Sequence, residues 1–266
     1  MNDFTLYKGC WINSSAPHLW KKLSGNEMSD LLSKGGLMVR NVYDFDCPNE
    51  TSFWCIIKDS FGGMDELSSK TRNRIRRAFT TIDYKLISPT QLLADGGYEV
   101  MVKACQGYKV KCDYPCETAF KKYMMSLSDC QIWGGYLKES GQIVVYSICR
   151  VGQDYCNLQT CKCDPFFLRH YYPYYGLFYF LSEHYLKQCG LKYIFDGTRT
   201  VTEHSNVQNY LEEKFNFRKV YCKLQVEYKP WMKLIVNILY PFRRYEILPL
   251  KVRGVLNMEA MRRGEM

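Results

Sequence analysis

Three apolar segments separated by short polar turns constrain the fold of this chain more than any other feature. The first, "CQIWGGYLK", covers residues 130–138, and the second, "GQIVVYSICRV", covers 141–151. Between them, "KESG" has the composition of a hairpin turn. A third segment, "YCNLQTCKCD" at 155–164, follows the turn "GQD". Because turns this short join antiparallel neighbours, we predict a three-stranded antiparallel meander.

The residues that follow predict a helix packed on this meander. Residues 174–189 are apolar nearly all round, which is typical of a largely buried helix. Pro173 suits the first turn of this helix, and Gly190 suits the residue after its end. The segment "LKYIFDGT" at 191–198 then predicts a buried strand.

A second short helix, from about Asn206 to Lys214, runs into a final strand through "FNF". The residue that ends a helix often has left-handed backbone geometry, where asparagine is the best residue after glycine. Asn216 therefore predicts a helix stop between two core phenylalanines. With helices expected at 98–105 and 116–128, the whole order predicts an α/β (α+β) fold whose mixed, mainly antiparallel sheet is flanked by helices.

Upstream of this order, a strand at 53–59 precedes a helix that we expect at 64–79. We expect Asp65 and Glu66 in its first turn, where they complement the helix dipole. Its polar face carries five cations, Lys70, Arg72, Arg74, Arg76 and Arg77. This face is either a solvated surface or an anion-binding surface. The net charge of +9 favours anionic partners such as nucleotides, phosphorylated cofactors, tRNA or acidic lipid.

The order of elements from residue 98 onward resembles the GNAT fold of N-acyltransferases. Phe217 matches a phenylalanine that many members of that family carry at the entry to a strand, with Asn216 in place of their glycine. The basic "TRNRIRRAF", and "RKVYCKLQVEYKP" followed by "YPFRR", resemble Fem-type aminoacyltransferases and related FemAB-like bacterial proteins. The resemblance implies a GNAT-like acyl-CoA N-acyltransferase fold. We expect three regions: a partial GNAT-like unit or extension at 1–95, a GNAT-like domain at 96–250, and a basic tail at 251–266 that frays.

The resemblance also implies an activity, the transfer of an acyl or aminoacyl group from acyl-CoA or aminoacyl-tRNA to an amine. In the family, the chemistry takes place where the fourth and fifth strands separate. An amine must lose a proton before it attacks a carbonyl carbon, so a base is needed there. The expected bases near these strand ends are Asp196, Glu203 and His204. The expected substrate-binding residues are Thr198, Arg199, Arg72 and Arg76.

The family's glycine-rich loop for the CoA pyrophosphate is altered in this chain. The matching positions read His170, Pro173 and Tyr175, and proline lacks an N–H donor. We therefore expect weak binding of acetyl-CoA. A phosphate group would instead be held by free N–H groups of Tyr174, Tyr175 and Gly176, together with the side chains of Arg169 and His170. An adenine or another nucleobase would stack on the ring of Tyr171, Tyr172 or Tyr174.

Two alternatives stay open: a catalytically silent GNAT-fold module that binds nucleotide or RNA, and a protein that works at a membrane surface. For the second, residues 230–244 would make a peripheral contact, because "PWMKLIVNILYPF" is too short and too interrupted to span a bilayer. The 13 cysteines show no zinc-type pairs, so we expect no metal. Without a signal peptide, we expect reduced thiols and a cytoplasmic location. The oligomeric state is not predicted.

Overall fold

The computed structural model describes residues 3–108, 112, 114–201, 206–245 and 247–265. By its contacts the chain divides into two compact units that interleave in sequence. The first unit comprises Met1–Cys55, Thr198–Glu203 and Lys219–Met266, and the second comprises Ile56–Gly197 and His204–Arg218. The regions 1–95, 96–250 and 251–266 expected from the sequence stay a prediction.

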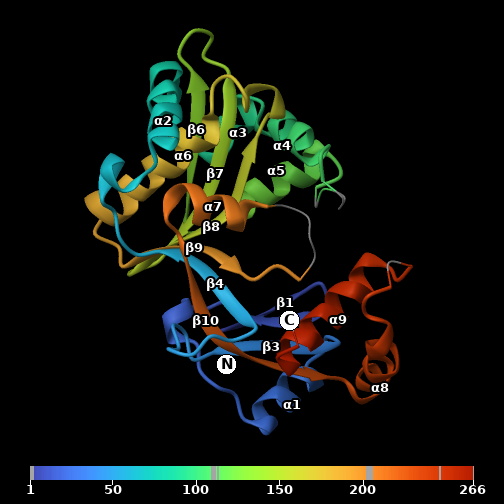
Figure 1. The fold of residues 1–266 in the computed structure, drawn as a ribbon. Coiled ribbons are helices and arrows are strands. Elements are labelled where there is room, and N and C mark those ends of the chain that lie inside the picture. Colours follow the sequence, from blue (N-terminus) through green and yellow to red (C-terminus); the bar gives the residue numbers. More distant parts are fainter. Residues whose placement is uncertain (1–2, 109–111, 113, 202–205, 246, 266) are drawn as a thin grey trace. The chain divides into compact units, whose positions relative to one another are not determined.

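The second unit contains the predicted meander (Figure 1). Strands β6 (Cys130–Leu137), β7 (Ile143–Val151) and β8 (Tyr155–Cys163) pair antiparallel in chain order. At one edge, β5 (Ile82–Ile87) pairs antiparallel with β6, and at the other β9 (Tyr193–Thr198) pairs parallel with β8. The mixed, mainly antiparallel sheet expected from the sequence is confirmed.

Helices cover both faces of this sheet. Two successive side chains of β6 contact helices on opposite faces. Ile132 of β6 lies in a core cluster with residues of α3 (Pro89–Ala94), α4 (Gly97–Cys105) and α5 (Glu117–Ser126). The next side chain, Trp133, packs edge-on against Phe180 of α6 (Pro173–Ser182), which continues as one π-helical segment to Gln188. Successive strand residues point to opposite faces, so the sheet is buried on both sides. Helix α2 (Ser69–Thr81) packs on α6.

The "FNF" junction has the geometry that the sequence predicts. Helix α7 (Val207–Phe215) ends at Asn216, whose φ of 55° and ψ of 35° are left-handed, and Phe215 and Phe217 are both buried. The Asn216 side-chain amide also donates to the carbonyl oxygen of Glu66 at 2.9 Å. The buried Lys58, at the end of β4 (Phe53–Lys58), donates to the Phe215 carbonyl at 2.9 Å. The helix stop is therefore tied to two distant parts of the chain.

Two substitutions at Asn216 separate the backbone effect from the hydrogen bond. Asn216→Ala removes the bond to Glu66 and leaves a Cβ in left-handed geometry, so we expect it to destabilise the fold by about 2 kcal/mol. Asn216→Gly loses the same bond but relaxes the backbone, so its cost should be about 1 kcal/mol lower. Urea unfolding of both variants measures the difference. Equal costs would show that the left-handed geometry carries no strain.

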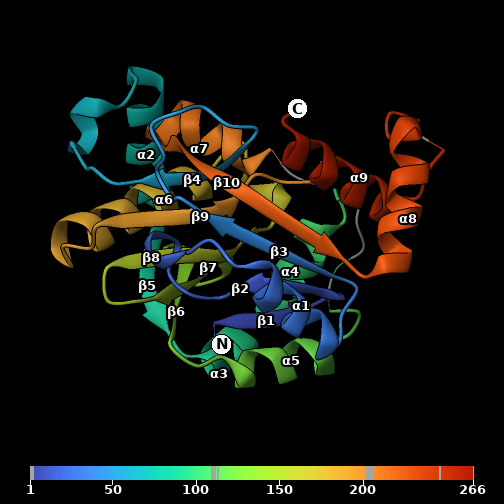
Figure 2. The ribbon, with the colours of Figure 1, turned by 90° about the horizontal axis from the view of Figure 1, so that it is seen from below.

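The first unit is a smaller sheet with its own helices. Strands β1 (Phe4–Tyr7) and β2 (Cys10–Asn13) pair antiparallel, β2 pairs parallel with β3 (Met38–Tyr43), and β3 pairs antiparallel with β10 (Arg218–Tyr228). Besides α1 (Gly25–Ser33), the unit contains α8 (Pro230–Leu239) and α9 (Leu250–Arg263), which Figure 2 shows side by side. Both contribute to a core cluster with strand residues, made of Met38, Val226, Tyr228, Val236, Leu256 and Met258.

Two expectations about helices are wrong. The tail from 251 does not fray: α9 runs to Arg263 and buries Leu256, Ala260 and Met261. Its buried Glu259 accepts hydrogen bonds from Arg262, Arg263 and Tyr228, which removes the cost of burying a lone carboxylate. The helix expected at 64–79 starts later, because the Ser68 hydroxyl accepts the Thr71 N–H and caps α2 there. Asp65 and Glu66 belong to a separate 3₁₀ turn, Gly63–Glu66.

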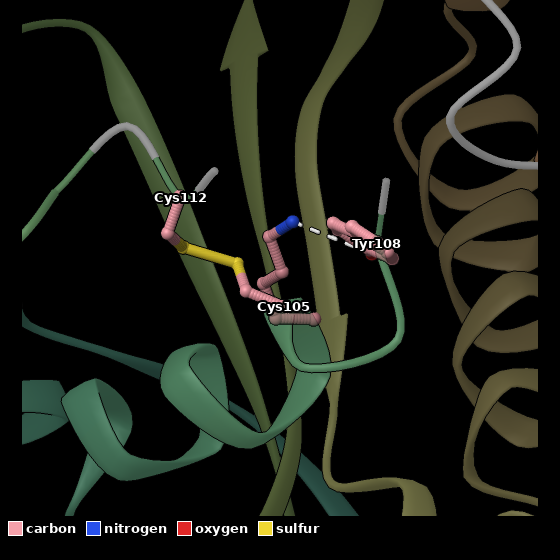
Figure 3. The surroundings of a disulfide bond; sticks show 4 residues. Cys105, Tyr108 and Cys112 are labelled. Atoms are coloured by element: carbon pink, nitrogen blue, oxygen red, sulfur yellow. Dashed lines mark hydrogen bonds between the residues drawn. A yellow bond between two sulfur atoms is a disulfide. The ribbon is translucent and has the colours of Figure 1, made fainter. Parts of the chain in front are cut away.

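The expectation that all thiols are reduced is also wrong for one pair. Cys105, at the end of α4, forms a disulfide with Cys112, as Figure 3 shows. Nearby, the Lys162 ammonium of β8 lies 3.4 Å from the Tyr108 hydroxyl. The other cysteines of the described chain are free thiols. Within the described residues, no helix is long and apolar enough to cross a membrane. The cytoplasmic location stays a prediction.

Candidate functional site

Strands β8 and β9 pair over a short distance and then separate. Their parallel pairing runs from Tyr155↔Tyr193 to Asn157↔Phe195, whereas β8 continues to Cys163 and β9 to Thr198. The first residue of β9 beyond the paired stretch is Asp196. The strand separation at which the GNAT resemblance locates the chemistry is therefore present, and it begins at one of the predicted bases.

Asp196 is a half-buried carboxyl that accepts no hydrogen bond and forms no ion pair with any described residue. Burial raises the pKa of Asp196 to about 8, because a carboxylate loses solvation when it leaves water and nothing replaces that solvation. A group with such a pKa is present in both protonation states near neutral pH. It can take a proton from a reacting group and release it again.

One thiol, Cys161 of β8, lies close enough to Asp196 to sense its charge. Ser147 Oγ of β7 lies 3.3 Å from the sulfur atoms of both Cys149 and Cys161. Burial raises the pKa of the Cys161 thiol, and the charges of Cys149 and Asp196 raise it further. Burial likewise raises the pKa of Cys163. Because the thiolate is the nucleophilic form, Cys161 and Cys163 are poor candidates for a covalent intermediate.

The start of α6 differs from the expected phosphate cradle. Tyr172 has a φ of 54°, rare for a bulky residue, and its carbonyl accepts the N–H groups of Tyr175 at 2.9 Å and Gly176 at 3.4 Å. Two of the three N–H groups that we expect to be free are therefore used within the chain. A Cβ at Gly176 would lie 2.2 Å from the Tyr84 hydroxyl oxygen, so this glycine is needed for packing. That Tyr84 hydroxyl donates to the Pro173 carbonyl at 2.8 Å.

Two arginines of α2 reach the same helix start. The Arg74 guanidinium donates to the Tyr175 hydroxyl and lies 5.2 Å from the ring centre of Tyr172. Arg77 lies 5.8 Å from that same ring centre. In the described part of the chain, no acidic side chain lies within 4.0 Å of the α2 cations Lys70, Arg72, Arg74, Arg76 and Arg77. The basic face of α2 is therefore not neutralised by ion pairs.

One residue that contacts Tyr175 is not among the site residues predicted from the sequence. Tyr210 of α7 packs edge-on against Tyr175, with ring centres 5.4 Å apart. Burial and the neighbouring Tyr175 raise the pKa of Tyr210, so its phenol stays protonated and can only donate or accept a hydrogen bond. The sequence signal for Tyr210 is weak, since it occupies the same apolar face of α7 as Leu211.

Of the other predicted donor residues, Arg169, His170 and Tyr171 lie between β8 and α6, and Tyr174 lies in the first turn of α6. Arg169 and His170 are exposed, and their side chains form no hydrogen bond with a described residue. Tyr171 is half-buried and packs on Phe167, with ring centres 5.5 Å apart. The Tyr174 hydroxyl donates to the Cys161 carbonyl at 3.4 Å and so links α6 to β8.

The predicted substrate residues are spread more widely. Arg72 donates to the Leu67 carbonyl at 2.8 Å, whereas Arg76 is exposed and bonds Asn73 at 3.2 Å. Arg199 belongs to the first unit, where its guanidinium donates to the Ser52 carbonyl at 2.6 Å. Thr198 belongs to the same unit. Glu203 and His204 lie outside the described residues.

The first unit has a hollow of about 610 Å³ that contains none of the predicted site residues. Its cations are paired: Lys223 with Asp44 at 2.7 Å, and Arg262 and Arg263 with Glu259. A ligand in this hollow would therefore meet cations that already have an acidic partner. No group of three or more His, Cys, Asp or Glu in the described chain could hold a metal ion.

No family model matches the chain, and no curated protein matches it in sequence. Among solved structures it is similar to FemX, with 9% identity and a TM-score of 0.51 over 82% of this chain and 72% of FemX. It is also similar to L-PGS from Bacillus licheniformis, with 11% identity and a TM-score of 0.52 over 89% and 83%. At such identities the likeness shows the fold alone. It confirms the predicted fold class, a GNAT-like fold similar to those of FemX and L-PGS.

Proposed function

We propose that this protein is an N-acyltransferase in which Asp196 is the general base. The observation that carries the proposal is an unpaired, half-buried carboxyl with a pKa of about 8 at the point where β8 and β9 separate. The acceptor amine gives a proton to Asp196, and its nitrogen then attacks the carbonyl carbon of a thioester or ester. A C–N bond forms, the C–S or C–O bond breaks, and the leaving group takes up a proton.

The donor is an anionic molecule, either aminoacyl-tRNA or acyl-CoA. Support comes from the cations of α2, two of which, Arg74 and Arg77, lie over Tyr172 at the start of α6. Because the N–H groups of Tyr175 and Gly176 are already used, the backbone offers little to a pyrophosphate. A donor held by arginine side chains fits this arrangement better than one held by a backbone cradle. Among the candidate donors, we therefore favour aminoacyl-tRNA most and acetyl-CoA least.

Donor binding tests this choice. Binding of aminoacyl-tRNA should fall steeply with salt, since arginine–phosphate contacts release counterions. The double substitution Arg74→Gln/Arg77→Gln should weaken binding roughly tenfold, equivalent to about 1.4 kcal/mol. Lys121→Gln/Lys122→Gln removes the same charge from exposed positions of α5 and is the matched control. Acetyl-CoA, measured by calorimetry, should bind more weakly than about 1 mM.

Three results would contradict parts of the proposal. A micromolar dissociation constant for acetyl-CoA would show that the altered loop still cradles pyrophosphate. An equal loss of affinity in the α5 control would show that only net charge matters. Tight donor binding without transfer to any amine in a broad acceptor panel would favour the second candidate, a catalytically silent module that binds nucleotide or RNA.

A further inference from the structure

Helix α8 is apolar on two faces, and only one of them is covered. On the inner face, Val236 is buried and Met232 and Leu239 are partly buried in the core cluster of the first unit. The outer face carries four large apolar side chains, Trp231, Leu234, Ile235 and Ile238. Their spacing of three, four and seven residues makes one continuous stripe along the helix.

The exposed apolar surface continues beyond the helix. Phe242, Tyr245 and Ile247 follow α8, and together with the four residues of the stripe they form what we call the α8 face. Each of its seven side chains is between 45% and 90% exposed. Apolar side chains exposed singly are ordinary, but seven within one short segment mark an interaction site.

The charges around the α8 face indicate what it binds. Residues 229–253 contain six lysines and arginines and one acidic residue. Lys233 pairs with Glu227 at 3.5 Å, and Arg243 pairs with Glu265 at 3.0 Å. In the described chain, Lys229, Arg244 and Lys251 have no acidic partner. An apolar stripe with unpaired cations beside it is complementary to an anionic lipid surface, with acyl chains beneath phosphate groups.

We propose that the α8 face lies in the interface of an anionic membrane. At 10 residues, α8 is about 15 Å long, half the thickness of a bilayer's hydrocarbon core, so it lies along the surface. Trp231 and Tyr245 have an apolar ring with a polar group, the composition that settles at the headgroup level. A second copy of this chain is a poorer occupant, because it would bring the same cations face to face. The inference stands independently of the proposed activity.

Vesicle co-sedimentation tests the proposal. The protein should bind phosphatidylcholine vesicles containing about one third phosphatidylglycerol at least tenfold more tightly than pure phosphatidylcholine vesicles, and salt should weaken that binding. Leu234→Ser/Ile238→Ser should reduce binding tenfold or more. Leu86→Ser/Met125→Ser, which removes two similarly exposed side chains from the second unit, should bind as wild type.

Tryptophan fluorescence provides a second measurement, which needs only the wild-type protein and one conservative variant. Trp231 is exposed, so its emission should shift to the blue on vesicle binding, and Trp231→Phe should lose most of that shift. Equal binding to neutral and anionic vesicles, or no binding to either, would overturn the proposal. So would unchanged binding by Leu234→Ser/Ile238→Ser. A concentration-dependent dimer that this variant abolishes, without vesicle binding, would assign the face to a second copy.

Discussion

Asp196→Asn is expected to remove most of the transfer activity and, at the same time, to stabilise the protein above neutral pH. The loss of a general base should lower the rate of the chemical step by roughly 10²–10⁴. Opposite effects on activity and stability are characteristic of a group kept in an unfavourable environment for function.

The direction of the stability effect follows from the pKa of Asp196. The usual pKa is 3.8, and burial raises it to about 8 in the folded protein. Below pH 4 the carboxyl is protonated in both states and costs nothing. Between pH 4 and 8 the unfolded chain loses the proton first, so stability falls as pH rises, and above pH 8 the cost is constant. Asparagine carries no charge, so the variant should gain a few kcal/mol at high pH.

Urea unfolding at pH 5 and at pH 8.5, together with single-turnover rates, measures both effects. Asp164→Asn is the matched control, because Asp164 is a buried carboxyl just after β8 that has partners. It pairs with Lys103 at 2.7 Å and accepts the Phe166 N–H at 3.0 Å, so removing its charge should destabilise the fold. Full activity in Asp196→Asn would show that another group takes the proton. A loss of stability at pH 8.5 would show that the carboxylate has a partner in the folded protein.

The parts of the fold that depend on local pattern could be predicted from the sequence. The meander follows from apolar segments with short turns, and the stop at Asn216 follows from left-handed geometry at a helix end. The sequence predicts a fraying tail where α9 forms, because the burial of α9 depends on Glu259 accepting hydrogen bonds from Arg262, Arg263 and Tyr228. Tyr228 lies 31 residues away in sequence, so no local window contains this network.

The candidate site shows the same limit. The position of Asp196 could be predicted, because the order of strands and the resemblance assign it to the strand separation. The pKa of its carboxyl could not, because it depends on how much solvent the packed chain removes. The basic face of α2 could be predicted as a group, but which arginine reaches Tyr175 depends on how α2 packs on α6. Whether the backbone N–H groups at the start of α6 are free depends on the Tyr172 carbonyl, which accepts two of them. Residue propensities do not predict the left-handed backbone of Tyr172.

The largest expected effect on stability is at the ion pair of Lys58 and Glu66. The Lys58 side chain is 2% exposed, and its ammonium donates to Glu66 at 2.7 Å and to the Phe215 carbonyl at 2.9 Å. Glu66→Gln would leave the ammonium buried without a counter-charge, and breaking a buried pair in this way costs about 3–5 kcal/mol. Lys58→Met keeps the chain length and removes the buried charge. Its cost should be clearly smaller, because Glu66 is partly solvated and still accepts the Gly62 N–H.

A double-mutant cycle tests this asymmetry. Lys58→Met/Glu66→Gln should be about as stable as Lys58→Met alone, because once the ammonium is gone the carboxylate has nothing to neutralise. Asp30→Asn, which breaks the exposed pair with Lys34, is the control and should cost less than about 0.5 kcal/mol. Since Lys58 also holds the last carbonyl of α7, amide exchange within 207–215 should accelerate in Glu66→Gln before the rest of the second unit. A cost below about 1 kcal/mol for Glu66→Gln would mean that water or another group replaces the carboxylate, and that the "FNF" junction does not depend on this pair.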